Sequence, residues 1–331
     1  MTGVSWRPSG PLDQEPLVAE RREEAAREPA PSRLWAPGYL ENELAHGRLD
    51  LLVWKPGDAE EQGLVVWQRI GPAGSRVVAL WVTPRHRTEA TLAALLTEVV
   101  RTGDLPPCVM VPDRSPGYPG GAIGEVLPAL GFRHVDRVRL HVALAHYPPV
   151  PPLGRRTMRT VGPNDRDALV RLFRRSYGRD ADTLFGAFLE LERDAREYID
   201  REILANPAWD RDASFVVEAR RRPVGCVLVQ REPSAPPLIA DLTVEPRARR
   251  TGVGSTLLAA ASNALLGQGA TTAELTVTLS NPNGAYAFYR RRGFEPVRDP
   301  RRKPGGIWVA RWFLRERKIR ILSEEATPLP D

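Results

Sequence analysis

The chain has 331 residues and a net charge of +6 at pH 7, and 42% of its residues are hydrophobic. This length allows two domains, each large enough to bury a core. No apolar run approaches the roughly 18 residues that a membrane span needs, and no apolar signal segment opens the sequence. We therefore expect a cytoplasmic protein with no membrane partner.

The positive charge is carried almost entirely by arginine, which is scattered through every segment. A nucleic-acid-binding protein would need basic and aromatic side chains clustered together, so we expect no nucleic-acid partner. Cys108 and Cys226 lie far apart and form no CxxC pair, which argues against a disulfide framework and a zinc site. We expect no metal. All five histidines lie in the first half, which excludes a histidine-based catalytic device built within the second half.

The first half predicts a small mixed domain. Residues 1–32 are rich in Pro, Glu and Arg, a composition typical of mobile lead-in segments. Apolar, β-branched runs then predict strands over residues 49–54, 63–70 and 77–82. A helical apolar pattern follows over residues 92–100. After a Pro/Gly-rich loop the pattern predicts a short helix that ends near Gly131, and then an alternating strand over residues 138–142.

The second half begins after a Pro-rich linker and predicts a longer alternation of strands and helices. Strands are expected over residues 156–161, 214–219, 223–230, 238–244 and 274–279, with further strands near residue 294 and over residues 307–314. Helices are expected from residue 165 to 173, from 184 to 204, from 255 to 266 and from 282 to 292. The tail mixes charges of both signs.

The two halves carry matching landmarks 162 residues apart, which indicates a duplicated domain. The pairs are Gly63 and Gly225, Val82 and Val244, Pro84 and Pro246, Arg85 and Arg247, Arg87 and Arg249, Gly131 and Gly293, and Phe132 and Phe294. The opening strand and helix of the second half, residues 156–173, have no expected counterpart in the first. The first copy therefore reads as a trimmed lobe.

A glycine pair follows the predicted strand of residues 238–244 and precedes a helical pattern. Gly252 and Gly254 have no Cβ atom, so the backbone there can approach a bulky anion closely. The N-terminus of the next helix points unpaired N–H groups and its positive dipole end at the same place. In the first half Ala90 and Leu92 stand at the matching positions, where their side chains would crowd a phosphate. The second half alone predicts a phosphate cradle.

The stretch that contains these glycines reads RRTGVG, an RxxGxG pattern directly after a strand. It resembles the coenzyme A pyrophosphate loop of the GNAT family of N-acetyltransferases. A plain strand-to-helix turn with solvated arginines is the alternative interpretation of this stretch alone.

A second motif stands at the expected distance. Residues 274–297 read ELTVTLSNPNGAYAFYRRRGFEPV, and Ala285, Tyr289 and Gly293 give the pattern AxxxYxxxGF, which resembles the second GNAT signature. Asn281 is expected to cap a helix whose first residue is Pro282. In the first half Leu127 matches Tyr289, so only the second copy keeps both signatures.

The resemblance implies that acetyl-CoA is the co-substrate. It implies that backbone groups of Leu242, Thr243 and Val244 hold the pantetheine arm. The loop residues that it assigns to the cofactor are Arg249, Arg250, Thr251, Gly252, Val253, Gly254 and Ser255. Asn281 and Asn283 are both candidates for the family asparagine that touches the coenzyme, because Pro282 stands at the usual position.

The resemblance also implies that Tyr289 is the general acid that protonates the coenzyme A thiolate, with a core aromatic as the alternative role. An amine acceptor needs a base to take its proton. Asp241 on the predicted strand is the first candidate, and a carboxylate paired with an arginine is an equal alternative. Glu218 and Glu274 are weaker candidates. In the ribosomal-protein acetyltransferases a glutamate stands where this chain has Thr276.

We therefore expect an α/β (mixed α+β) fold of two tandem GNAT-like domains, each a central mixed, mostly antiparallel sheet flanked by helices. The expected division is a flexible lead-in over residues 1–32, a degenerate GNAT-like lobe over 33–147, a Pro-rich linker over 148–154, a GNAT acetyltransferase domain over 155–314 and a tail over 315–331. Pairing of the two lobes predicts a monomer.

The expected activity is transfer of an acetyl group from acetyl-CoA to a primary amine, by direct attack of the amine. The acceptor is a small molecule or a peptide. Acidic residues that attract a cationic amine, or that form only a solvated helix face, are Asp180, Asp182, Glu190, Glu192 and Asp194. One alternative is a non-catalytic acyl-CoA-binding sensor, which would not need Tyr289. A subordinate alternative is an acetyltransferase similar to mycothiol synthase.

Overall fold

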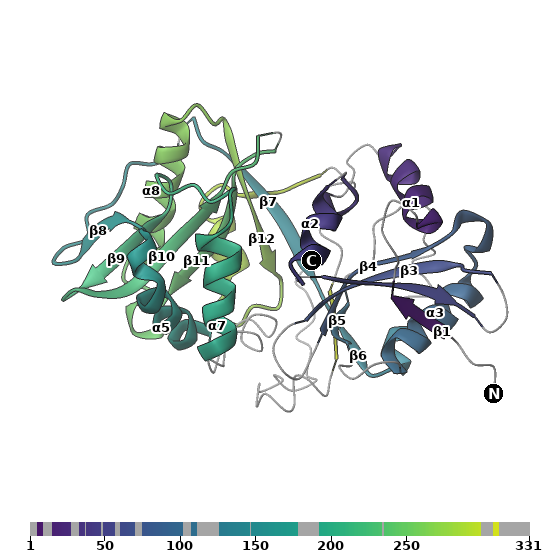
Figure 1. Cartoon of the computed structure of the whole chain (residues 1–331). Helices are drawn as coiled ribbons and strands as arrows, with labels where there is room; N and C mark the ends of the chain where they lie inside the picture. The colour runs from purple at the N-terminus through teal and green to yellow at the C-terminus, as the bar shows by residue number, and fades with distance from the viewer. Residues whose placement is uncertain are drawn as a thin grey trace. The chain divides into compact units, whose positions relative to one another are not determined.

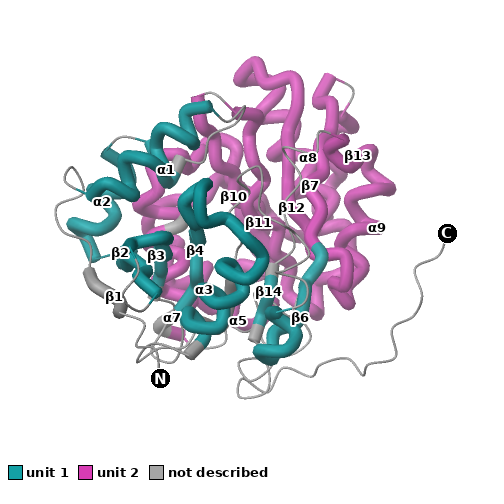
Figure 2. The backbone as a smooth tube through the Cα atoms, turned by 90° about the vertical axis from the view of Figure 1, so that its right-hand side faces the viewer, with its two compact units in different colours: residues 1–136, 305–313 teal, residues 137–304, 314–331 magenta. Residues whose placement is uncertain are grey.

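The computed structural model shows two compact units, residues 1–136 with 305–313 and residues 137–304 with 314–331 (Figure 2). The residues that it describes are 5–8, 15–27, 33–36, 38–47, 49–56, 60–69, 75–101, 107–110, 126–145, 147–177, 192–233, 235–298 and 307–310. Each unit contains a seven-stranded sheet with helices packed on it (Figure 1). Each sheet has one parallel strand pair among antiparallel ones, which confirms the predicted fold class.

The first unit has the strand order β1-β2-β3-β4-β5-β14-β6. Its strands are β1 (Ser5–Pro8), β2 (Asp50–Lys55), β3 (Gly63–Arg69), β4 (Ser75–Val82), β5 (Pro107–Met110), β6 (Phe132–Val135) and β14 (Ile307–Ala310). Its helices are α1 (Pro16–Ala26), α2 (Tyr39–Ala45) and α3 (Glu89–Arg101), with short 3-10 helices η2 (Arg33–Trp35) and η3 (Pro84–His86).

The second unit has the strand order β13-β7-β12-β11-β10-β9-β8. Its strands are β7 (Arg137–Ala143), β8 (Thr157–Thr160), β9 (Phe215–Ala219), β10 (Arg222–Gln230), β11 (Leu238–Val244), β12 (Thr272–Thr278) and β13 (Glu295–Pro296). Its helices are α5 (Arg166–Tyr177), α7 (Glu192–Tyr198), α8 (Val253–Gly267) and α9 (Ala285–Arg290). A π-helix, η5 (Ile199–Leu204), and the 3-10 helices η4 (Pro163–Asp165) and η6 (Pro246–Ala248) complete it.

Each sheet contains one strand from the other half of the sequence. Strand β7, which the sequence placed in the first lobe, lies between β12 and β13 of the second sheet. Strand β14, from near the C-terminus, lies between β5 and β6 of the first sheet. The compact units therefore do not divide at the Pro-rich linker. Apolar alternation predicts a strand but not which neighbour that strand pairs with, so this exchange could not be predicted from the sequence.

We expected residues 1–32 to form a flexible lead-in, but parts of this segment belong to the first unit. Strand β1 pairs with β2 antiparallel, and helix α1 buries Leu17, Val18 and Ala25 against the first core. In the second unit β8 pairs with β9 in the same way. The first copy thus keeps a counterpart of the opening strand. The few apolar residues of α1 stand among many charged ones, so composition alone did not predict that this helix packs into the core.

The register of the two sheets confirms the duplication. Gly63 pairs with Val82 in the first unit, and Gly225 pairs with Val244 in the second. Both strand pairs also carry an irregularity at the matching place, where one residue of the second strand, Val78 or Ala240, has no partner in the register. An insertion of this kind is a β-bulge, which bends a strand and re-aims its side chains.

Gly63 and Gly225, which match at the repeat offset, both stand where a side chain would not fit. A Cβ atom on Gly225 would lie 2.8 Å from Val253 Cγ1 and 3.1 Å from Leu257 Cδ1, both in α8. A Cβ atom on Gly63 would lie 2.7 Å from the backbone oxygen of Trp81 and 3.4 Å from a methyl carbon of Leu95. These distances leave no space for a side chain. The two landmarks at the 162-residue offset therefore mark the same close approach of a helix to a strand.

The second sheet buries two different faces, as strand β10 shows most clearly. Val224, Val227 and Val229 belong to the core cluster that includes α8. Cys226 and Leu228 belong to the cluster formed with α5 and α7. Helix α8 therefore covers one face, and α5 and α7 cover the other. A strand buried on both faces reads as an almost continuous apolar run, as residues 223–229 do.

Several predicted elements lie partly or wholly outside the described residues. The helix predicted over residues 184–204 is described only from Glu192, as α7 followed by the π-helix. The Pro/Gly-rich loop of residues 112–121, the acidic residues Asp180, Asp182 and Glu190, and the tail 315–331 lie outside. In the described part of the chain no helix is long and apolar enough to cross a membrane.

The strand exchange predicts that a fragment which starts at the linker will not fold. A fragment of residues 148–331 lacks β7, so β12 and β13 lose their shared neighbour and expose unpaired edges. We expect no cooperative thermal unfolding transition for it by circular dichroism. A fragment of residues 137–331 keeps β7 and is the matched control, which should unfold cooperatively. Equal melting of the two fragments would contradict the role of β7.

Candidate functional site

The loop between β11 and α8 forms an open helix N-terminus. Gly252, the N-cap residue of α8, has φ = 88°, and Arg250 has φ = 61°, so both occupy the left-handed region. No side chain caps α8, and no acidic residue stands in its first turn. A Cβ atom at Gly252 would meet nothing within 4 Å. The amides of this turn are therefore arranged to bind an anion.

The matching helix of the first unit has a capped N-terminus. Helix α3 begins at Glu89, two residues earlier than α8 begins at the repeat offset. The Thr88 hydroxyl oxygen accepts the backbone N–H of Thr91 at 3.1 Å, and Glu89 places negative charge in the first turn. A side-chain cap and a carboxylate both disfavour an anion at this terminus. The prediction of a degenerate first copy is confirmed at this point.

Strands β11 and β12 pair through a single register position, Leu238 with Glu274, although both strands have seven residues. Leu242, Thr243 and Val244 lie beyond that position, and the structure describes all of them. Their other edge pairs with β10. The edge of β11 that faces away from β10 is therefore the one on which an extended ligand with amide groups can add.

The bulge at Ala240 places Asp241 on the face covered by α5 and α7. Ile239, Leu242 and Val244 pack with the α8 cluster. Asp241, 5% exposed, instead contacts tyrosines of α5 and α7. In a regular strand without the bulge, Ile239 and Asp241 would point to the same side, because side chains two residues apart share a face.

Two tyrosines donate to the Asp241 carboxylate. The Tyr177 hydroxyl, at the end of α5, lies 3.1 Å from Oδ1, and the Tyr198 hydroxyl, at the end of α7, lies 2.5 Å from Oδ2. Thr243 Oγ1 donates to the Tyr177 oxygen at 3.1 Å. We had not identified either tyrosine as a site residue. Nothing in the sequence links the C-terminal ends of two helices to a strand about 40 residues or more away, so only the fold reveals them.

Tyr289 is a buried side chain of α9 and is 9% exposed. Its ring contacts those of Phe288 and Phe294, with centroids 5.2 Å and 5.6 Å away, so it also belongs to the core. Burial, and then the charge of Asp241, raise the pKa of Tyr289 above its ordinary value. The phenol is therefore protonated at neutral pH, the state that a general acid requires.

The other carboxylates considered as bases are paired elsewhere. Glu218 Oε1 lies 2.6 Å from Arg159 Nη2, and Glu274 Oε2 lies 3.0 Å from Arg139 Nε on β7. Thr276 pairs in register with Arg139. Of these candidates, Asp241 is the one whose charge raises the pKa of Tyr289, after burial.

Arg249 connects three parts of the site through its side chain. Its Nε donates to the Val244 oxygen at 3.1 Å, Nη2 to the Ser176 oxygen at 2.9 Å, and Nη1 to Asn283 Oδ1 at 2.7 Å. The end of β11, the residue before Tyr177 and the loop before α9 are thus held together. In the first unit Arg87 keeps the bond to the matching Val82 oxygen, at 3.0 Å.

The loop before α9 differs from the predicted cap. Asn281 Oδ1 accepts the backbone N–H of Asn283 at 2.9 Å and so forms a turn. Helix α9 begins at Ala285, after Gly284 with φ = 69°, and not at Pro282 as we expected. The local side-chain bond competes with helix formation here. The oxygens of Asn281 and Asn283 are therefore engaged within the chain.

A second arginine stands beside the open helix end. Arg292 donates to Ser255 Oγ in the first turn of α8, and its guanidinium lies 3.7 Å from the centroid of the Phe288 ring. A Cβ atom on Gly254 would lie 3.5 Å from that same ring. Burial lowers the pKa of Arg292 from its usual value. The sequence analysis did not identify Arg292 as a site residue.

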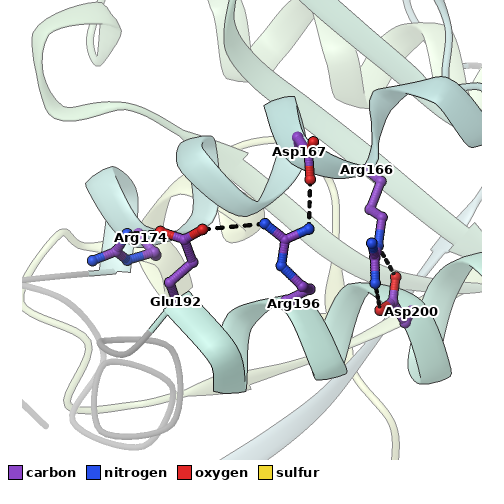
Figure 3. A network of polar contacts seen from close by, with 6 residues as sticks. All are labelled: Arg166, Asp167, Arg174, Glu192, Arg196 and Asp200. Atoms are coloured by element: carbon purple, nitrogen blue, oxygen red, sulfur yellow. Dashed lines mark hydrogen bonds and ion pairs between the residues drawn. The ribbon is translucent and has the colours of Figure 1, made fainter.

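An ionic ladder joins α5 to α7 and to the start of η5 (Figure 3). Arg166 pairs with Asp200, and Arg196 Nη1 lies 2.6 Å from Asp167 Oδ1. Glu192 accepts from Arg196 at 3.1 Å and from Arg174 at 2.9 Å. Single exposed pairs contribute little, and networks contribute more. The ladder aligns α7 with α5, so that Tyr198 and Tyr177 reach the same carboxylate.

Comparison with known proteins agrees with this geometry. Residues 210–296 match the family model described as Acetyltransferase (GNAT) domain. The matched part of the second unit is therefore a GNAT domain. The family uses acetyl-CoA, and its fold supports acyltransferase activity in general. No curated protein sequence matches the chain significantly. The described residues contain no group of three or more His, Cys, Asp or Glu side chains that would hold a metal ion.

Solved structures show the same fold over almost the whole chain. A GCN5-related N-acetyltransferase from Sphaerobacter thermophilus is 19% identical with a TM-score of 0.58, over 92% of this chain and 94% of that one. A tandem GNAT protein from the clavulanic acid biosynthesis pathway is 16% identical with a TM-score of 0.57, over 93% and 98%. A GNAT-family acetyltransferase from Colwellia psychrerythraea is 12% identical with a TM-score of 0.51, over 92% and 98%.

The bonds of Arg249 predict a stability role. Replacing Arg249 with Met leaves the Val244 and Ser176 oxygens without this donor, and we expect a loss of roughly 1–3 kcal/mol in the free energy of unfolding. Arg250→Met is the matched control on the same loop. Its side chain is exposed, so the change should stay within about 0.5 kcal/mol. Equal destabilisation by both changes, measured by chemical denaturation, would argue against a stabilising role of the Arg249 hydrogen bonds.

Proposed function

We propose that this protein transfers an acetyl group from acetyl-CoA to a primary amine, and that its second unit carries the activity. The observation that supports this most is the difference between the two helix ends. The N-terminus of α8 is open and contains Gly252 as its N-cap and Gly254 in its first turn, whereas the matching terminus of α3 is capped by Thr88. A cradle retained in only one copy is expected if only that copy binds the cofactor.

The residues that would hold the cofactor line the end of β11 and the start of α8. The backbone amides of residues 250–255 would bind the pyrophosphate, and the free edge of residues 242–244 would pair with the pantetheine arm. Arg292 adds positive charge beside the loop. Arg249, Asn281 and Asn283 would act by shaping the loop, because their side chains are bonded within the protein.

The proposed chemistry is direct attack. Asp241 takes a proton from the acceptor ammonium group, and the neutral amine nitrogen then forms a bond to the thioester carbonyl carbon. Backbone N–H groups at the free edge of β11 stabilise the oxyanion. The carbon–sulfur bond breaks, and the leaving thiolate takes the phenol proton of Tyr289. The nitrogen loses its second proton as the neutral amide forms, and that proton restores the phenol of Tyr289.

The coupling between Asp241 and Tyr289 suits this order of events. The negative charge of Asp241 is one cause of the raised pKa of Tyr289, after burial. When Asp241 becomes neutral by taking the proton of the amine, that cause disappears. Tyr289 then becomes a stronger acid at the stage when the thiolate needs a proton. Two groups whose charges act on each other are best treated as one coupled pair.

Two conservative substitutions test the assignment. Tyr289→Phe and Asp241→Asn each remove one proton-transfer group, so kcat should fall by about 10² to 10⁴. Affinity for acetyl-CoA should change little. The measurement is thiol release from acetyl-CoA against a panel of primary amines, with calorimetry for affinity. Tyr286→Phe, on the same helix, is the control and should keep full activity.

A protein that binds acetyl-CoA but acetylates no amine would support the alternative of a non-catalytic acyl-CoA sensor. Full activity of Tyr289→Phe would remove this tyrosine from the mechanism. Both outcomes are readable without knowing the natural acceptor, provided that the panel includes alkylamines, aromatic amines, polyamines and lysine peptides.

A further inference from the structure

One buried carboxylate receives two phenol hydrogen bonds, one on each oxygen. Tyr177 donates to Asp241 Oδ1 and Tyr198 donates to Oδ2. An ionised carboxylate only accepts hydrogen bonds, whereas a protonated one must donate from one oxygen. Two donors on opposite oxygens therefore favour the ionised form.

The direction of the hydrogen bonds is fixed by a third residue. Thr243 Oγ1 donates to the Tyr177 oxygen, so the phenol proton of Tyr177 is directed at Asp241. Burial, and then the charge of Asp241, raise the pKa of Tyr177 well above its ordinary value. Tyr177 consequently keeps its proton over the working pH range and remains a donor.

Four other elements contribute side chains that interact with Asp241. Cys226 of β10 faces it, and burial raises the pKa of this thiol well above its usual value. Tyr289 of α9 also interacts with its charge. Tyr177 comes from α5 and Tyr198 from α7. Of these groups, Tyr177 and Tyr198 donate hydrogen bonds to Asp241, whereas Cys226 and Tyr289 interact with its charge.

Aromatic rings build one wall beside the carboxylate. The Phe173 ring lies 5.5 Å from that of Tyr177 and 5.9 Å from that of Tyr198, between centroids. A carboxylate next to aromatic rings is a chemical environment that favours a cationic amine. The ionic ladder of Figure 3 joins α5, which carries Phe173 and Tyr177, to α7, which carries Tyr198.

We propose that Tyr177 and Tyr198 are positioning residues that hold Asp241 as the anion to which the acceptor binds in its ammonium form. The substrate class is then a cationic primary amine. This inference rests on the proposed function, since it assigns Asp241 as the group that meets the acceptor. Neither tyrosine transfers a proton to the substrate itself.

The test compares Tyr177→Phe and Tyr198→Phe with the control Tyr286→Phe. Each change removes only a hydroxyl group, and the Tyr286 hydroxyl makes no bond to Asp241. With the best acceptor among phenethylamine, spermidine and a lysine peptide, the acid limb of the pH profile of kcat/KM should move up by about one pH unit or more in the first two variants. KM for the amine should rise at neutral pH, while acetyl-CoA affinity stays unchanged.

The sign of the shift follows from the hydrogen bonds. A donor to the carboxylate favours its charged form, so losing the donor lets Asp241 take up a proton at higher pH. Activity that needs the Asp241 anion is then lost at a higher pH than in the unmutated protein. An acid limb that stays in place in both variants, as in Tyr286→Phe, would overturn the inference. A purely structural role would lower melting temperature without moving the limb.

A second readout does not depend on turnover. Aspartate labelled with ¹³C at the carboxyl carbon reports its own titration by NMR, and Asp241→Asn identifies the resonance. We expect the Asp241 signal to titrate at higher pH in Tyr177→Phe and Tyr198→Phe than in the unmutated protein. An unchanged titration overturns the role of the tyrosines. Absence of amine acetylation together with the expected titration shift would instead overturn the proposed function alone.

Discussion

A single inserted residue in a strand sets which side chains of β11 share a face. Ala240 has no register partner on β10, and Ile239 therefore packs toward α8 together with Leu242 and Val244, while Asp241 lies toward α5 and α7. Helix α8 and the pair α5 and α7 cover opposite faces of one sheet, and β11 contributes side chains to both faces. In the proposed function, the free edge of β11 would hold the thioester on the strand that carries the Asp241 carboxylate.

The first unit shows what the scaffold needs apart from chemistry. It keeps the bulge, the glycine under the helix and the arginine that bonds to the end of its central strand. It has lost the open helix end. At the place of Thr243 it carries Trp81, whose indole N–H donates to Glu24 at 2.6 Å. The features that both copies share are contacts of the scaffold, and the open helix end of the second copy is the feature on which the proposed function rests.

The sequence predicted the features that depend on local pattern. The glycines of the loop, the repeat offset and the helix that carries Tyr289 follow from backbone freedom and side-chain periodicity, which act over a few residues. Strand exchange and the Tyr177–Asp241–Tyr198 contacts depend on which distant elements meet, and periodicity does not contain that information. Arg249 was assigned to the cofactor from its motif. Its side chain instead bonds to three neighbouring segments, because a guanidinium can serve several acceptors at once.

The most direct test of this account is a calorimetric titration of acetyl-CoA into the unmutated protein and into Gly254→Leu, which copies Leu92 of the first unit. We predict one equivalent bound by the unmutated protein. The leucine would fill the space beside Phe288 and Val244, and binding should be lost while the fold remains intact by circular dichroism. Two equivalents, or binding that survives the substitution, would contradict the assignment of the cofactor to the second unit.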